Sequence, residues 1–109
     1  MTRKTITRDK ACDIVLKLMD AQCGEALIEL DSYGENIKSK DDVEVFTRFT
    51  VRDLSWFIGA RDAFNNLFGE SHESTMITIK TNQIAKHISK HAHEIVKEKM
   101  KEFEVVGND

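Results

Sequence analysis

Three of the four histidines lie in one short segment, "IAKHISKHAHEIVKEKM" at residues 84–100. In an α-helix, which turns about 100° per residue, His87 and His91 fall on one side and Glu94 follows within a turn. Two imidazoles and a carboxylate are zinc ligands, so these residues form a candidate metal site. The segment lacks the Glu directly after the first His that a His-Glu-x-x-His protease needs. The sequence therefore favours a simpler alternative, the solvent-exposed rim of an amphipathic helix.

A row of lysines runs beside the histidines on the same expected helix. A lysine stripe can follow a phosphate backbone, so nucleic-acid binding is an alternative function, with Arg3, Lys4 and Arg8 as further contacts. The expected helix carries no arginine, which is the usual reader of bases. The stripe consists of Lys86, Lys90, Lys97 and Lys101.

The middle of the chain is acidic, whereas both ends are basic, and the formal net charge is −3. Electrostatic complementarity would steer an acidic surface toward a partner protein with a basic surface. We therefore expect the partner-binding residues in the densest acidic part of the chain, at Asp31, Glu35, Asp41, Asp42 and Glu44.

The residue patterns of common enzyme sites do not occur in the sequence. Cys12 and Cys23 lack Cys-x-x-Cys spacing and fall on nearly the same helical face, which predicts reduced, buried thiols. Asp41 and Asp42 are adjacent, so their side chains point apart. We expect a non-enzymatic protein with no cofactor. No apolar run approaches the roughly 20 residues that span a bilayer, so a cytoplasmic protein without membrane contact is expected.

The apolar spacing predicts an α+β fold in the order helix, strand, strand, helix, strand, helix, with a small three-stranded sheet. A helix capped by Thr7 should end or kink near Gly24. Strands are expected at "ALIELD" (residues 26–31), "VEVFTRF" (43–49) and "STMITIK" (74–80), because β-branched and aromatic residues recur there.

Two further helices complete the predicted fold. One begins at Thr50 with Asp53 in a capping pattern, and Gly69 ends it. Another begins at Thr81 and runs to about Glu104. Their predicted buried faces are Leu54, Phe57, Ile58, Arg61, Phe64, Leu67 and Phe68 on the first, and Ile84, Ile88, Ala92, Ile95, Val96, Met100 and Phe103 on the second.

An all-α bundle remains as the alternative, with residues 25–49 helical, because Ser39 followed by Asp42 also forms an N-cap pattern. Residues 1–109 form one expected domain, with flexible ends at residues 1–6 and 105–109. The apolar faces favour a homodimer as a further option.

These observations together favour a small, non-enzymatic regulator or inhibitor that docks on a partner protein through an acidic surface. A phage or mobile-element inhibitor, or an immunity-type protein, has this character. Nucleic-acid binding through the lysine stripe is the second hypothesis, and metal binding is the third.

Overall fold

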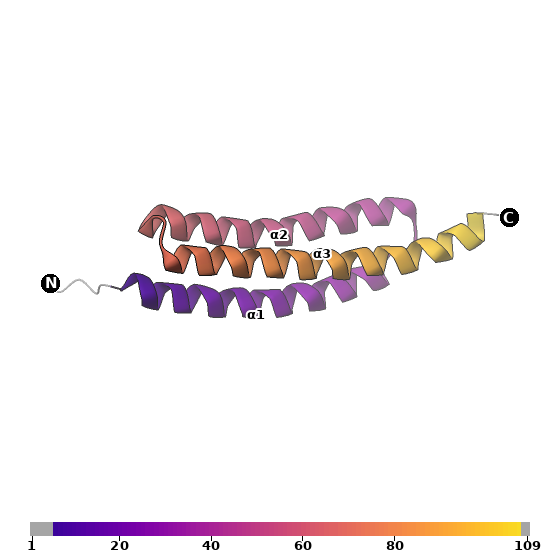
Figure 1. The fold of residues 1–109 in the computed structure, drawn as a ribbon. Coiled ribbons are helices and arrows are strands. Elements are labelled where there is room, and N and C mark those ends of the chain that lie inside the picture. The colour runs from indigo at the N-terminus through magenta and orange to yellow at the C-terminus, as the bar shows by residue number, and fades with distance from the viewer. Residues whose placement is uncertain (1–5, 108–109) are drawn as a thin grey trace.

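The computed structural model describes residues 6–107, and side chains within residues 6–102. This range forms three helices, α1 (Arg8–Glu35), α2 (Lys40–Phe68) and α3 (His72–Gly107). Consecutive helices are antiparallel, so α1 and α3 run in the same direction (Figure 1). Helix α3 packs against both α1 and α2 more extensively than these two pack against each other. The molecule is elongated, with extents of 71 × 27 × 18 Å.

The predicted sheet is wrong, because residues 6–107 contain no strand, and the all-α alternative describes this part of the chain. Helix α1 continues through Gly24, which is exposed, and includes the predicted strand at residues 26–31. Ala26 and Leu30 lie one helical turn apart and are both fully buried, whereas Ile28 is 71% exposed. The segment therefore buries a helical face, and this packing overrides its β propensity.

The other two predicted strands are also helical, for the same physical reason. Residues 43–49 lie in α2, and residues 74–80 form the first turns of α3. Ser74, Ile77 and Thr81 are buried at helical spacing, whereas Met76 and Ile79 are 40% and 52% exposed. Burial thus follows a period near 3.6 and not the alternation of a strand.

Capping hydrogen bonds confirm the predicted helix start at Thr7 and the start at Ser39 that belonged to the all-α alternative. Thr7 Oγ1 accepts from the Lys10 backbone N–H at 3.2 Å, and Ser39 Oγ accepts from the Asp42 N–H at 3.3 Å. The Asp42 carboxylate in turn accepts from the Lys38 N–H at 2.8 Å. These bonds satisfy backbone donors that have no partner within the helix.

The predicted caps at Thr50 and Thr81 are wrong, because both residues lie inside helices. Each hydroxyl donates to the carbonyl four residues earlier, Thr50 to Phe46 at 3.0 Å and Thr81 to Ile77 at 2.8 Å. Gly69 ends α2 as predicted, with a φ of 73° and its N–H donating to the Asn65 carbonyl at 2.8 Å.

One core runs along the bundle and receives side chains from all three helices. Met19, Leu30, Phe57, Ile77 and Ile88 are each 0% exposed. The predicted buried face of α3 is confirmed at Ile84, Ile88 and Ala92, while Ile95 and Val96 are partly buried against the core. Phe103 lies outside the residues whose side chains are described, as do residues 1–5 and 108–109 among the predicted flexible ends.

The predicted buried face of α2 is only partly correct. Phe57 and Phe64 are buried, but Ile58 is 43% exposed and Leu67 is 77% exposed. Both cysteines are free; Cys12 is buried and Cys23 is partly buried, which agrees with reduced thiols at the core. Among the helices described, none contains a stretch long and apolar enough to cross a membrane.

Helices α1 and α3 keep a constant register along their length. Asp20 pairs with Lys80 at 2.8 Å and Asp31 with His91 at 2.7 Å, each 60 residues apart in sequence. At Gly34 the two helices approach closely, since a Cβ there would lie 2.6 Å from Cγ2 of Ile95. A side chain at position 34 would therefore displace Ile95 or separate the helices.

We expect Gly34→Ala to destabilise the protein, because overpacking costs about 1–3 kcal/mol and offsets the gain in helix propensity of about 1 kcal/mol. Gly24→Ala is the matched control, since nothing lies within 4 Å of its Cβ position. The control should raise the free energy of unfolding, measured by urea denaturation. If the two variants were equally stable, the close contact at Gly34 would not exist in solution.

Asp53 is a carboxyl group inside the bundle, 7% exposed, and its Oδ2 has no hydrogen-bond partner among the described residues. Burial raises the pKa of Asp53, repulsion from Glu29 adds to this effect, and Arg52 opposes it. The folded protein therefore holds this proton more tightly than the unfolded chain. Stability is lost as pH rises from the unfolded pKa of about 4 through the raised folded pKa.

We expect Asp53→Asn to raise the Tm at pH 7, because the amide carries no charge to desolvate. The gain should shrink as pH falls to 3, where Asp53 is itself protonated. Thermal melts at both pH values measure the difference, with the exposed Asp13→Asn as a control. A gain that was the same at both pH values would contradict this explanation.

Candidate functional site

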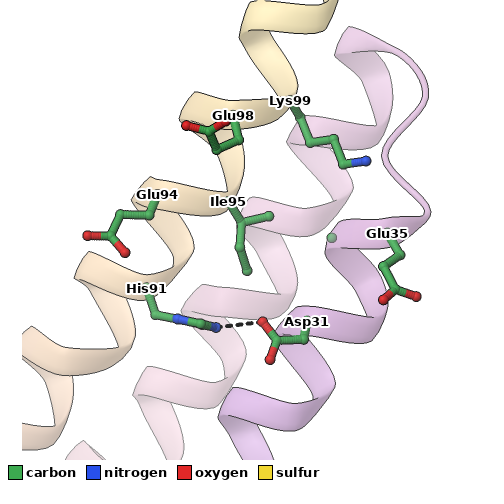
Figure 2. A pocket seen from close by; sticks show the side chains of 8 residues that line it. Asp31, Glu35, His91, Glu94, Ile95, Glu98 and Lys99 are labelled. Carbon is green, nitrogen blue, oxygen red and sulfur yellow. Dashed lines mark hydrogen bonds and ion pairs between the residues drawn. The ribbon is translucent and has the colours of Figure 1, made fainter.

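A groove of about 480 Å³ lies between the C-terminal end of α1 and the C-terminal half of α3 (Figure 2). Four carboxylates line it, together with one histidine and one lysine, and Gly34 and Ile95 lie between them. We refer to it as the acidic groove. Its charged and titratable residues are Asp31, Glu35, His91, Glu94, Glu98 and Lys99.

Helical spacing explains why these residues meet. On α3, positions 91, 94, 95 and 98 follow an i, i+3, i+4, i+7 pattern, and positions 31, 34 and 35 share one side of α1. The constant register between the helices places the two sets opposite each other. The close approach of Gly34 to Ile95 therefore sets the separation of the two helices along the groove.

His91 links the two helices across the acidic groove. Its Nε2 lies 2.7 Å from Oδ1 of Asp31, and since a carboxylate oxygen accepts, the imidazole N–H donates. Figure 2 shows His91 directed toward Asp31 and Glu94 directed away from it. The side chains of His91 and Asp31 are 32% and 62% exposed, so water screens the pair and its contribution to stability is small.

The candidate metal ligands are not brought together. His87 is exposed, His91 is occupied by Asp31, and Glu94 points away from that pair in Figure 2. Within the described residues, no three His, Cys, Asp or Glu side chains lie close enough to hold a metal ion. The histidine segment therefore contacts α1 through His91, and its own histidines do not converge on one point.

The five acidic residues expected to bind a partner divide into two sets. Asp31 and Glu35 line the acidic groove, whereas Asp41, Asp42 and Glu44 lie at the start of α2 and do not line it. Asp42 forms the helix cap, and Glu44 pairs with Arg48 at 2.7 Å. Asp41 is exposed in the first turn of α2. In the structure, Asp31 and Glu35 therefore share a groove with Glu94 and Glu98, and not with the acidic residues at the start of α2.

The lysine stripe is exposed at all four predicted positions, which are Lys86, Lys90, Lys97 and Lys101. Lys101 pairs with Glu98 of the acidic groove at 3.1 Å. The stripe therefore borders negative charge, which weakens its attraction for phosphate. Of the N-terminal bases, Arg8 pairs with Glu73 at 3.0 Å, while Arg3 and Lys4 lie outside the described residues.

Neither cysteine has the environment of a catalytic nucleophile. Burial raises the pKa of the Cys12 thiol, and the nearby carboxylates, Glu73 foremost, raise it further. Burial also raises the pKa of Cys23, with Asp20 adding to it and Lys80 opposing it. Thiols with raised pKa values are protonated near neutral pH and react slowly.

Sequence reasoning missed Lys99, Gly34 and Ile95 as groove residues, because residues 26–31 were assigned to a strand. The acidic i, i+4 pairs at 31/35 and 94/98 were visible in the sequence, but their pairing depends on the register between two helices. Comparison of the chain with protein-family models, with curated proteins and with solved structures finds no match. Function is therefore inferred from the groove itself.

We expect a double-mutant cycle with Asp31→Ala and His91→Ala to give a coupling free energy of about 0.5 kcal/mol, as for exposed ion pairs. Urea denaturation of the four proteins measures it. The pair Asp20–Lys80, at 2.8 Å between the same helices, supplies the matched control. If the coupling were zero for Asp31–His91 but measurable for Asp20–Lys80, His91 would not contact Asp31 in solution.

Proposed function

We propose that this protein is a non-enzymatic docking protein that binds a basic surface of a partner protein in the acidic groove. The observation that carries the proposal is that four carboxylates from two helices line one groove. Lys99 and His91 are the groove's basic residues, so negative charge prevails there at neutral pH. Such a surface raises the association rate with basic partners and disfavours acidic ones.

The groove suits the side chain of a partner's arginine or lysine. A guanidinium group can donate two parallel hydrogen bonds to a carboxylate, and its aliphatic stem can lie along Ile95 and Gly34. Glu94 and Glu98 are four residues apart on α3, an arrangement of like charges that costs a helix about 0.2–0.5 kcal/mol. Lys101 already pairs with Glu98 at 3.1 Å, and a bound cation would relieve this repulsion further.

More specifically, we propose that the protein is a cytoplasmic regulator or inhibitor of the phage, mobile-element or immunity type. Its support is two free cysteines and an acidic face suited to a basic partner such as a nucleic-acid-binding protein. Asp41, Asp42 and Glu44 lie at the same end of the bundle and would extend this face. The proposal assigns no chemical reaction to the protein.

The proposal is tested by charge reversal with a matched control. In the groove variant, Glu35, Glu94 and Glu98 become Lys, which leaves the contact of Asp31 with His91 intact. In the control variant, Asp13, Asp62 and Glu70 become Lys at the opposite end of the bundle. All six residues are exposed, so both variants should fold and both carry the same net charge.

We expect the wild type and the control variant to retain a protein partner from nuclease-treated lysate of the native cell, with at least tenfold less retained by the groove variant. Quantitative mass spectrometry of the bound proteins measures the difference. Equal retention by both variants would contradict docking through the acidic groove.

Nucleic-acid binding through the lysine stripe is the second candidate function, favoured by the exposure of all four lysines along one side of α3. It requires that a labelled DNA or RNA duplex bind at low salt and dissociate steeply as salt rises. Lys86→Glu with Lys90→Glu should then abolish binding, whereas the groove variant should strengthen it. No binding at low salt would exclude this candidate.

A further inference from the structure

The acidic groove contains one histidine, His91, among residues of fixed charge. Histidine is the side chain that ordinarily gains or loses its charge between pH 5 and 8. Carboxylates and ammonium groups ordinarily keep their charges across that range. Those that line the groove come from α1 and α3, and α2 contributes none of the described lining residues. They are Asp31, Glu35, Glu94, Glu98 and Lys99.

His91 lies where a change in its charge acts on the whole groove. Its Nε2 is 2.7 Å from Oδ1 of Asp31, and Figure 2 shows the ring reaching from α3 toward α1. Glu94 and Glu98 follow three and seven residues later on α3, roughly 4.5 and 10 Å along the helix axis. These separations do not exceed the Debye length of about 10 Å at 0.1 M salt. A charge on His91 therefore interacts with carboxylates of both helices.

Protonation of His91 changes the groove in two ways. Because Nε2 donates to Asp31, the neutral ring has its lone pair on Nδ1, and that nitrogen takes up the proton. The resulting imidazolium forms an ion pair with Asp31, the carboxylate that it already contacts. It also reduces the negative charge of the groove by one. Four carboxylates against Lys99 leave −3, and four against Lys99 and a charged His91 leave −2.

We propose that His91 makes docking in the acidic groove depend on pH, so that a basic partner binds more tightly at pH 7.5 than at pH 5.5. The inference rests on the proposed docking function and adds the regulation of the same site. A charged His91 repels an arginine or lysine of the partner and engages Asp31 in the groove. Affinity therefore falls as the pH falls. By linkage, a bound cation also disfavours the proton on His91.

The size of the effect follows from Coulomb's law. A unit charge about 6 Å from a bound cation weakens its binding about threefold, even at the dielectric constant of bulk water. The walls of the groove exclude part of the water, which strengthens the repulsion. We therefore expect the dissociation constant to rise at least threefold between pH 7.5 and pH 5.5 at low salt.

The test is isothermal titration calorimetry with an oligo-arginine peptide, blocked at both ends so that its charge is the same at pH 7.5 and pH 5.5. The wild type should bind at least threefold more weakly at pH 5.5. His91→Gln cannot be protonated, but its amide can still donate to Asp31, so it should bind nearly equally at both pH values. His91→Lys is charged at both, and should bind at pH 7.5 as weakly as the wild type does at pH 5.5.

His87→Gln is the matched control, because His87 is exposed on the same helix and does not line the groove. This variant should keep the pH response of the wild type. Asp53, whose pKa is raised by burial, is present in every variant, so its titration cannot explain a difference between them. Circular dichroism at both pH values confirms that each variant is folded.

The outcomes separate this inference from the docking proposal. If the peptide did not bind the wild type at pH 7.5, docking in the acidic groove would be wrong, and its pH dependence with it. If the peptide bound equally at both pH values, only the role of His91 would be overturned. The same holds if His91→Gln lost as much affinity at pH 5.5 as the wild type and His87→Gln.

Discussion

The close approach of α1 to α3 at Gly34 and Ile95 is the contact on which the rest of the structure depends. It belongs to a register in which Asp20 meets Lys80 and Asp31 meets His91, each at a separation of 60 residues. These contacts, together with the bond from Cys12 Sγ to the Glu73 carbonyl, extend over about 33 Å of helix at 1.5 Å per residue. Two helices held parallel over that length leave α2 to cover the remaining apolar side of α3.

This register also creates the charge pattern of the surface. In a different register, Asp31 and Glu35 would be separate acidic residues on α1, and Glu94 and Glu98 would be ordinary exposed residues of α3. Brought together by this register, they line one groove and give this part of the surface an excess of carboxylates. The same packing leaves α1 and α2 less closely associated than either is with α3. The acidic groove therefore follows from how the three helices share one core.

The sequence could predict the features that depend on local chemistry. Thr7 and Gly69 were identified correctly, and Ser39 within the all-α alternative, because caps and terminators act within a single turn. The buried face of α3 was also predicted, since Ile84, Ile88 and Ala92 keep a clear helical period. The sheet was predicted wrongly because β-branched residues at 43–49 and 74–80 suit a strand in isolation.

The features that depend on tertiary packing could not be predicted in this way. Gly24 does not end α1, since an exposed glycine costs a helix only about 1 kcal/mol and the burial of Ala26 and Leu30 offsets that cost. Leu67 was assigned to the buried face although it is the side chain that faces outward. The acidic groove depends on a register between helices 60 residues apart, which no local pattern encodes.

The most direct measurement of the central claim is a titration of the ¹⁵N-labelled protein with an arginine-rich peptide, followed by NMR at two salt concentrations. A docking groove predicts that the largest amide shifts occur at Asp31, Glu35, Glu94 and Glu98, and that they decrease as salt rises. Shifts spread evenly over the acidic residues of all three helices would contradict a defined groove. Shifts confined to the lysine stripe on addition of duplex DNA, with none from the peptide, would contradict protein docking altogether.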